Sequence, residues 1–187
     1  MSNVQQAKEF LASADLIHSA DTVLDAVRRV AGEISEQLCE ANPVLLCVMS
    51  GGVPFAGHLM TMLQFPLDFD YLHVTRYGQD TAGGALSWRA APWIPVKGRT
   101  VLVVDDILDE GVTLAAVRDR LLQQGAARVL MAVVADKENG KQKPIAADFV
   151  ALKVPDRFVF GFGMDACGAW RNLPAIYAMK EEPQCSA

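Results

Sequence analysis

Three carboxylates, a glycine and a threonine follow an apolar run, 101–104, in the middle of the chain. They are Asp105, Asp106, Asp109, Gly111 and Thr113. Carboxylates can accept hydrogen bonds from sugar hydroxyls or hold a divalent cation. A glycine before a helix start leaves backbone N–H groups and the positive end of the helix dipole for a phosphate. This pattern predicts a site for a phosphorylated sugar together with a metal ion.

The residues on either side predict the elements that would position this motif. Four β-favouring apolar residues at 101–104 indicate a buried strand, and the acidic residues would then form a turn. The helical spacing of Leu114, Val117 and Leu121 predicts a helix that Gly125 ends. A strand, an acidic turn and a helix in this order place a ligand at the carboxyl end of a parallel sheet.

Strand and helix patterns alternate through most of the chain. A helix is predicted over 20–38, with one apolar face and with Ser19 or Asp21 as its cap. Buried strands are predicted at 44–49 and 128–135. This alternation favours an α/β fold with a central parallel sheet of about five strands, flanked by helices.

We expect the 187 residues to form a single domain, 1–187, with a core at about 15–147. Gly, Asp, Ser, Ala and Pro dominate 76–95, which predicts a flexible loop or a loose hairpin over 85–89. The last part, mainly 148–187, is predicted to form a small hood beside the core. Three short strands are expected there, at 149–152, 158–162 and 175–179.

Composition narrows the possible classes of protein. A net charge of −5 gives no support for binding to nucleic acid or to an anionic membrane. The longest apolar run, 129–135, is too short to span a bilayer, and no signal-peptide pattern opens the chain. The four cysteines form no CxxC pair, and Cys47 is expected in the core. We therefore expect a cytoplasmic protein.

Other protein classes share parts of the acidic motif. The start VLVVDD resembles a receiver domain, which would then need an aspartate at the end of the third strand, followed by a Ser/Thr strand and a Lys-Pro turn; no ending with all three in this order appears. DDILD matches the DDxxD spelling of prenyl-diphosphate synthases, where the motif lies on a helix, but here an apolar β-run precedes it and Gly111 follows. A solvated acidic turn without function fits poorly with a Gly-x-Thr helix start.

The segment 101–114 resembles the phosphoribosyl-diphosphate (PRPP) motif of the type I phosphoribosyltransferases. Over nearly its whole length, the chain resembles the hypoxanthine-guanine phosphoribosyltransferases within that family. The resemblance implies that Asp105 and Asp106 bind the ribose hydroxyls, directly or through Mg²⁺, and that Asp109 is the general base or acid near purine N7. It also implies a 5′-phosphate loop made of Glu110, Gly111, Val112 and Thr113.

Three further segments match family elements that bind PRPP. Ser50 and Gly51 lie in a segment similar to the pyrophosphate loop, where a peptide bond that is often cis aims N–H groups at the diphosphate, although Ser-Gly-Gly alone indicates only a tight turn. Arg76 and Tyr77 lie where the family has a flexible loop that would exclude water from the reaction. Arg171 matches an arginine that reaches toward pyrophosphate.

The remaining matches concern the purine. Lys137 matches the lysine that meets O6, which would favour 6-oxopurines over adenine. Phe158 would stack on the base, and Val159 would present backbone groups to its Watson–Crick edge. Asp165 matches a carboxylate linked to the metal, so that Asp105, Asp106 and Asp165 are the predicted metal ligands. Without the family context, a strand-end lysine is usually solvated and a phenylalanine usually belongs to the core.

Two positions depart from the family pattern. Glu110 stands where threonine is common, and its carboxylate would repel a phosphate, so we expect it to point outward. Ser50 stands where many relatives carry lysine. Both changes would weaken the site for anions.

The resemblance implies a purine salvage enzyme that makes IMP or GMP and pyrophosphate from hypoxanthine or guanine and PRPP, with Mg²⁺ as cofactor. It also implies a homodimer or homotetramer. Two alternatives stay open: a xanthine-preferring phosphoribosyltransferase, and a regulator of this fold that senses nucleotides without catalysis. An RNA-binding regulator would need a basic face, whereas this chain is acidic.

Overall fold

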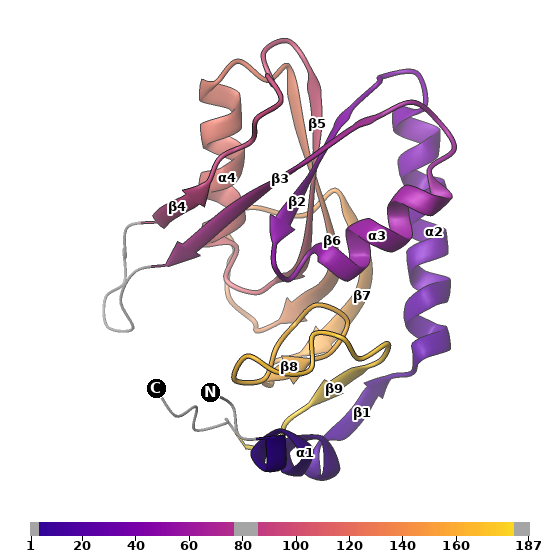
Figure 1. The fold of residues 1–187 in the computed structure, drawn as a ribbon, viewed down its shortest axis with the longest axis vertical. Coiled ribbons are helices and arrows are strands. Elements are labelled where there is room, and N and C mark those ends of the chain that lie inside the picture. Colours follow the sequence, from indigo (N-terminus) through magenta and orange to yellow (C-terminus); the bar gives the residue numbers. More distant parts are fainter. Residues whose placement is uncertain (1–3, 77–85, 182–187) are drawn as a thin grey trace.

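The computed structural model describes residues 4–76 and 86–181, which form a large sheet with helices on both faces and a small sheet at one end (Figure 1). The helices are α1 (Val4–Ser13), α2 (Ala20–Leu38), α3 (Val53–Met62) and α4 (Val112–Gln123). The strands are β1 (Asp15–His18), β2 (Val44–Met49), β3 (Asp68–Arg76), β4 (Leu86–Ala90), β5 (Thr100–Leu108), β6 (Arg128–Glu138), β7 (Phe149–Pro155), β8 (Val159–Phe160) and β9 (Ile176–Ala178).

The large sheet has the strand order β4-β3-β2-β5-β6-β7. Five of these strands run parallel: β3, β2, β5, β6 and β7. The remaining strand, β4, pairs antiparallel with β3 at one edge. The prediction of an α/β fold with a parallel sheet is therefore confirmed, with the antiparallel edge strand as an addition. Parallel pairing brings the carboxyl ends of β2, β5 and β6 to the same edge, where a ligand site is expected.

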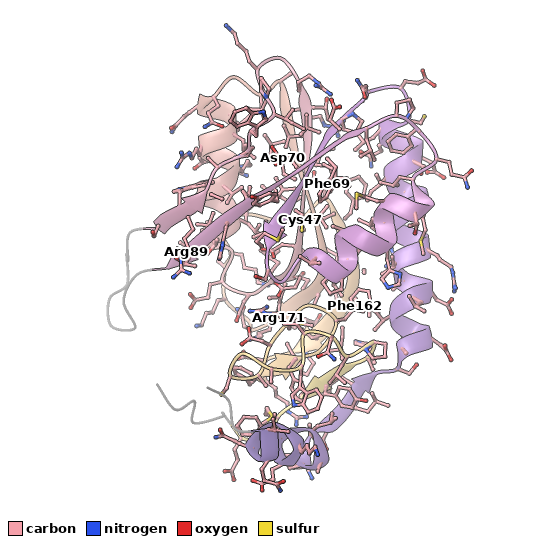
Figure 2. The ribbon with its side chains drawn as sticks, viewed as in Figure 1. Cys47, Phe69, Asp70, Arg89, Phe162 and Arg171 are labelled. Atoms are coloured by element: carbon pink, nitrogen blue, oxygen red, sulfur yellow. The ribbon has the colours of Figure 1, made fainter. Side chains whose placement is uncertain are left out.

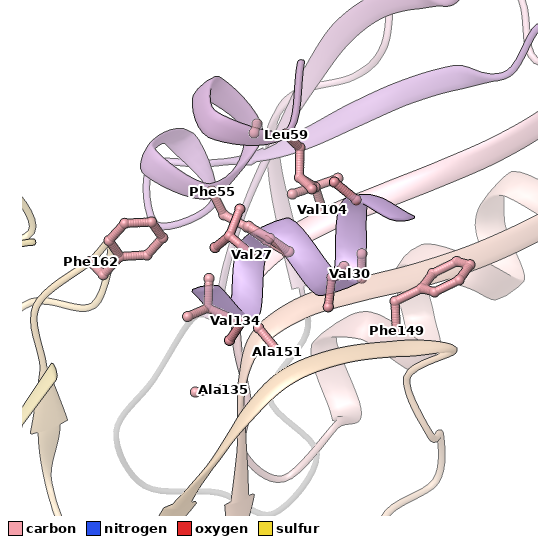
Figure 3. Packing of buried hydrophobic residues seen from close by; sticks show 14 of the residues in the cluster. Val27, Val30, Phe55, Leu59, Val104, Val134, Ala135, Phe149, Ala151 and Phe162 are labelled. Carbon is pink, nitrogen blue, oxygen red and sulfur yellow. The ribbon is translucent and has the colours of Figure 1, made fainter. Parts of the chain in front are cut away.

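Both faces of the large sheet are buried, which explains the uninterrupted apolar runs in its strands. Helices α2 and α3 cover one face, where Val27, Phe55 and Leu59 pack against Val104 (Figure 3). Helix α4 covers the other face through residues that include Val117. The side chain of Ser19 accepts a hydrogen bond from the backbone N–H of Thr22, so the predicted cap of α2 is confirmed.

The small sheet has the order β1-β9-β8 and lies at the lower end of the molecule in Figure 1, beside α1. We keep the name hood for these three strands and residues 161–175. The predicted division into a core at 15–147 and a hood at 148–187 differs from this topology at both ends. β7 belongs to the large sheet because it pairs with β6, whereas β1 pairs with β9 and joins the hood.

The segment 76–95 is in part a hairpin. β4 pairs with the end of β3, as the prediction of a loose hairpin over 85–89 proposed. Residues 77–85, which include Tyr77, lie outside the described residues. Cys47 is buried, as predicted. Within 4–76 and 86–181, no helix has both the length and the apolar character needed to cross a membrane.

Candidate active site

Two adjoining cavities lie where the carboxyl ends of the parallel strands meet the hood. One has a volume of about 490 Å³ and is lined on the hood side by Phe158 and Val159. The other, of about 580 Å³, is lined by Gly51 and Gly111. Both cavities are lined by Asp106, Ile107, Asp109, Lys137, Asp156 and Asp165. If each cavity held its own ligand, the residues that line both cavities would contact both ligands.

The acidic pair lies on a strand and not in a turn, which corrects the expectation from the sequence. β5 continues to Leu108, because Asp105 and Ile107 still pair with β6, opposite Val133 and Ala135. Asp109 comes directly after the strand. The acidic side chains alone suggested a turn. The backbone stays extended because β6 supplies hydrogen bonds to it along this stretch.

The pKa values of Asp105 and Asp106 are both raised above the ordinary carboxyl value. Burial is the main cause for both, and the neighbouring charge of Asp106 raises the pKa of Asp105 further. The guanidinium of Arg171, 3.7 Å from Asp106 Oδ2, acts in the opposite direction. The Arg171 guanidinium balances only part of the charge of the two adjacent carboxylates. This pair could therefore bind a metal cation or several hydrogen-bond donors.

The loop after β2 lies directly against this acidic pair. The peptide bond between Met49 and Ser50 is cis, as the resemblance implied. A Cβ atom on Gly51 would collide with the carboxylate of Asp106, and one on Gly163 would collide with the carbonyl oxygen of Gly51. Glycine is therefore required at both positions, since it allows the loop, the acidic strand and the hood to approach one another.

The start of α4 faces the larger cavity. Gly111 precedes the helix with a left-handed φ of 78°, a conformation that favours glycine. Glu110 and Thr113 also line this cavity, whereas Val112 is 49% exposed and does not. The glutamate side chain is 46% exposed and lies 3.5 Å from Lys141 Nζ.

Asp109 and Lys137 form an ion pair where the two cavities meet. Lys137 Nζ lies 2.7 Å from Asp109 Oδ2, and the lysine side chain is 14% exposed. The amide of Asn139 donates a hydrogen bond to Asp109 Oδ1 at 3.2 Å. Asn139 was not predicted from the sequence, although the Asn139-Gly140 pair so soon after Lys137 is a turn signal that could have indicated it.

The hood supplies the other wall of the smaller cavity. Phe158 is partly buried there, and Val159 belongs to β8, which pairs with β9. Met164 and Met179 also line this cavity and were not predicted from the sequence. Aromatic and thioether side chains together form a surface on which a flat ring can stack.

Arg171 lies at the junction of the hood and the large sheet (Figure 2). Its guanidinium is 2.5 Å from Asp165 Oδ1 and donates a hydrogen bond to the carbonyl oxygen of Gly163 at 2.6 Å. Asp165 also accepts a hydrogen bond from the N–H of Gly168. In the part of the chain that the structure describes, no three His, Cys, Asp or Glu side chains form a group that could hold a metal. Asp165 pairs with Arg171, and the assignment of Asp105, Asp106 and Asp165 as metal ligands stays a prediction.

The flexible loop predicted from Arg76 and Tyr77 is only partly described. Arg76 is the last residue of β3, at the side of the sheet that carries the site, and its backbone pairs with β4. Tyr77 lies outside the described residues. The role assigned to these two residues therefore stays a prediction.

Comparison with known proteins connects this geometry to a family. The model of the phosphoribosyl transferase domain matches residues 13–166. A hypoxanthine-guanine phosphoribosyltransferase of Streptococcus pneumoniae (strain ATCC BAA-255 / R6) is 33% identical over 165 residues, which cover 88% of this chain and 92% of that protein. One from Streptococcus thermophilus (strain CNRZ 1066) is 31% identical over 168 residues, covering 89% of this chain and 93% of that protein.

Solved structures agree with the sequence relatives. A hypoxanthine-guanine-xanthine phosphoribosyltransferase superposes with a TM-score of 0.82 at 30% identity, covering 89% of this chain and 97% of that one. A hypoxanthine-guanine phosphoribosyltransferase of Bacillus anthracis has a TM-score of 0.83 at 25% identity, covering 88% and 98%. The strand order, the glycine loop against the acidic strand and the relatives all point the same way: the chain belongs to the phosphoribosyltransferase family, among the hypoxanthine-guanine phosphoribosyltransferases.

Proposed function

We propose that this chain joins hypoxanthine or guanine to PRPP, forming IMP or GMP and releasing pyrophosphate. One observation carries the proposal: Asp109 and Lys137 lie together at the boundary between the two cavities and line both of them. A carboxylate and an ammonium at this boundary can act on a base in one cavity while a phosphorylated sugar fills the other. Membership of the family supports the same reaction.

The smaller cavity suits the purine. Phe158 offers an aromatic face, and Val159 offers backbone groups beside it. The ammonium of Lys137 can donate a hydrogen bond to the O6 atom of hypoxanthine or guanine. The 6-amino group of adenine is itself a donor and would leave that ammonium without an acceptor. Adenine should therefore be a poor substrate.

The larger cavity suits PRPP. The start of α4, with Gly111 and Thr113, would bind the 5′-phosphate through backbone and hydroxyl donors. The loop at Ser50 and Gly51 would face the diphosphate, with Arg171 as a multidentate donor. Each of these groups donates hydrogen bonds or carries positive charge, as a polyanionic substrate requires.

Asp105 and Asp106 would hold the ribose hydroxyls and the cofactor Mg²⁺. The acidic pair fits this cation, because one or two protein carboxylates together with substrate phosphates are the usual ligands of Mg²⁺. Bound Mg²⁺ would neutralise the charge that builds up on the leaving pyrophosphate.

In the proposed reaction, purine N9 forms a bond to ribose C1′ while the bond from C1′ to the pyrophosphate oxygen breaks. Asp109 accepts the proton that N7 loses. Lys137 now contacts Asp109 Oδ2, so movement of its ammonium to O6 would make that oxygen more available to the N7 proton. General-base help of this kind typically contributes about 10²–10⁴-fold, and the rest would come from positioning and charge stabilisation.

The experiment that tests this function is a spectrophotometric assay of the purified chain with PRPP and Mg²⁺. Hypoxanthine, guanine, xanthine and adenine are supplied separately. Conversion of hypoxanthine or guanine that requires Mg²⁺, with adenine inert, supports the proposal. Rapid conversion of xanthine alone would favour the xanthine-preferring alternative. No conversion of any base, with PRPP still bound, would favour the non-catalytic regulator.

We also propose that the chain forms a homodimer or homotetramer. On β3, Phe69 and Tyr71 are 43% and 45% exposed, and contact between copies would remove this aromatic surface from water. Light scattering after size-exclusion chromatography tests this proposal, which a monomeric mass would contradict. The cytoplasmic location stays a prediction that cell fractionation can check.

A further inference from the structure

The turn that follows β6 lies against the loop that follows β5. It contains Asn139, Gly140 and Lys141, and the main-chain N–H of Lys141 donates to Asn139 Oδ1 at 3.1 Å. Asn139 and Lys141 both line the larger cavity. Neither residue belongs to the motifs identified in the sequence, yet each contacts one of the two carboxylates at the start of the phosphate loop.

The first contact concerns Asp109, whose two carboxylate oxygens are bound by different residues. Oδ2 faces Lys137 and Oδ1 accepts from the Asn139 amide, which also donates to the Asp109 main-chain oxygen at 3.3 Å. When Lys137 turns to the purine, the Asn139 bonds persist. They would keep Oδ1 occupied and leave Oδ2 available to the N7 proton.

The second contact concerns Glu110. Its carboxylate lies 3.5 Å from Lys141 Nζ, beside the groups that would bind the 5′-phosphate. Both side chains are largely exposed, at 46% and 68%, so their ion pair adds little to the stability of the fold. Its local effect on charge is larger, because an unpaired glutamate would repel a phosphate in this cavity.

A part-buried ammonium, that of Lys143, fixes the turn in this position. Lys143 is 13% exposed, and its Nζ donates to the carbonyl oxygens of Leu108 at 2.8 Å and Lys137 at 2.7 Å. It also lies 2.5 Å from Asp136 Oδ1. These bonds tie the end of β5 to the end of β6, so the turn and the phosphate loop are held together as one unit.

We propose that the turn 139–141 is a further part of the active site and holds Asp109 and Glu110, the two acidic residues between β5 and α4. Asn139 orients Asp109 toward the purine, and Lys141 neutralises Glu110 so that the loop accepts a phosphate. Both are positioning residues, since they act through carboxylates. This inference rests on the proposed function and accounts for how the chain tolerates glutamate at position 110.

The role of Asn139 is tested with Asn139→Ala and Asn139→Asp, measured with hypoxanthine and PRPP. Asn139→Asp keeps the acceptor for the Lys141 N–H but replaces the donor to Asp109 with a second carboxylate. We expect kcat to fall about 10- to 100-fold in both, with the KM for PRPP unchanged, since a hydrogen bond to a charged group is lost. Gln142→Ala, at an exposed position of the same segment, is the matched control and should keep wild-type rates. Wild-type kcat in Asn139→Asp would overturn this role.

The role of Lys141 is tested by a double-mutant cycle with Glu110→Gln. Lys141→Met should raise the KM for PRPP about fivefold, with the KM for the base unchanged. In the Glu110→Gln background, Lys141→Met should have little further effect, because the charge that it neutralises is gone. An equal effect in both backgrounds, or none in either, would overturn the proposed role. Lys153→Met is the control, since Lys153 forms an exposed ion pair with Glu138 on the far side of β6 from this loop.

The two levels of proposal fail in different ways. A wild-type chain that converts no base would overturn the proposed function. An active wild type whose Asn139→Asp and Lys141→Met variants match it would overturn only the role of the turn. Calorimetric titration with PRPP and Mg²⁺ compares Lys141→Met with Glu110→Gln without needing turnover, and thermal melts exclude unfolding as the cause of any loss.

Discussion

The carboxylates of this site fall into two regions that differ in how their charge is balanced. At the end of β5, Asp105 and Asp106 lie side by side, and the Arg171 guanidinium is 3.7 Å from Asp106 Oδ2. The pKa values of both carboxyl groups are raised. In the loop after β5 and in β6, Asp109 and Asp136 each contact a lysine within 2.7 Å. The difference indicates that the first region depends on ligands to balance its charge, whereas the second is set by the protein itself.

The most severe test of this comparison is Asp109→Asn. It removes the proton acceptor but keeps a side chain of the same shape, so turnover should fall by about 10²–10⁴-fold. The fold and the binding of PRPP should be retained. Single-turnover rates with hypoxanthine, together with a calorimetric titration with PRPP, measure both. Normal turnover would show that Asp109 is not the base.

A second test removes Lys143, whose ammonium balances the charge of Asp136 in the second region. Lys143→Met should lower the free energy of unfolding by about 1–3 kcal/mol, because a part-buried carboxylate and two carbonyl oxygens lose their donor. Lys153→Met, which breaks an ion pair in contact with solvent, should cost far less. Urea unfolding of both variants gives the comparison. Equal losses would mean that burial of the Lys143 ammonium does not matter.

Removing a charge from the acidic pair, Asp105 and Asp106, should stabilise the folded protein and not destabilise it. Because the pKa of folded Asp105 is raised, the folded state without ligand disfavours its charged form. This penalty is absent below the ordinary carboxyl pKa of about 3.9, grows as the pH rises toward the folded pKa, and is complete above it. Asp105→Asn should therefore raise the melting temperature at pH 8, by roughly 2–4 °C for each kcal/mol, and abolish activity.

Melting curves of the wild type and Asp105→Asn between pH 5 and pH 8, recorded without ligand, measure this effect. The stabilisation by the variant should shrink as the pH falls, since the wild-type carboxyl becomes protonated in the folded state. Saturating PRPP and Mg²⁺ should reverse the order of the two proteins, because only the wild type then gains ligand contacts. A difference that is independent of pH would argue against an unbalanced charge at this position.

The smallest effect concerns Cys47, which lies behind the acidic pair. Burial, together with the negative charges of Asp105 and Asp106, raises the pKa of this thiol to about 12. A thiol reagent at pH 8 should therefore modify exposed Cys39 and spare Cys47 in the folded protein. Peptide mapping by mass spectrometry separates the two sites, and unfolding in guanidinium should expose both. Fast labelling of Cys47 in the folded chain would contradict the burial of this region.

Much of the site could be predicted from the sequence because its parts follow local rules. The apolar run before Asp105, Gly111 at the start of a helix and the glycines after β2 each belong to a short segment with its own period or turn chemistry. Such patterns indicate where a backbone turns and which residues follow a buried strand. The resemblance of these segments to one family then supplied the expected roles.

The contacts between segments were decided by the tertiary structure. Asn139, Lys141 and Lys143 follow β6 in a segment where Asn139-Gly140 indicates only a turn. They reach the loop after β5 because β6 pairs with β5 beyond Asp105. Within the hood, Asp165 forms an ion pair with Arg171, a contact that no local pattern indicated.

The amino-acid sequence by itself determined the strands, the helices and the chemistry that their ends carry, since these depend on neighbours within a few residues. The placement of β1 beside β9, of β7 in the large sheet and of Gly163 against Gly51 joins residues far apart in the chain. Such pairings depend on how whole faces pack and on which backbone groups find partners, and only the folded chain settles them.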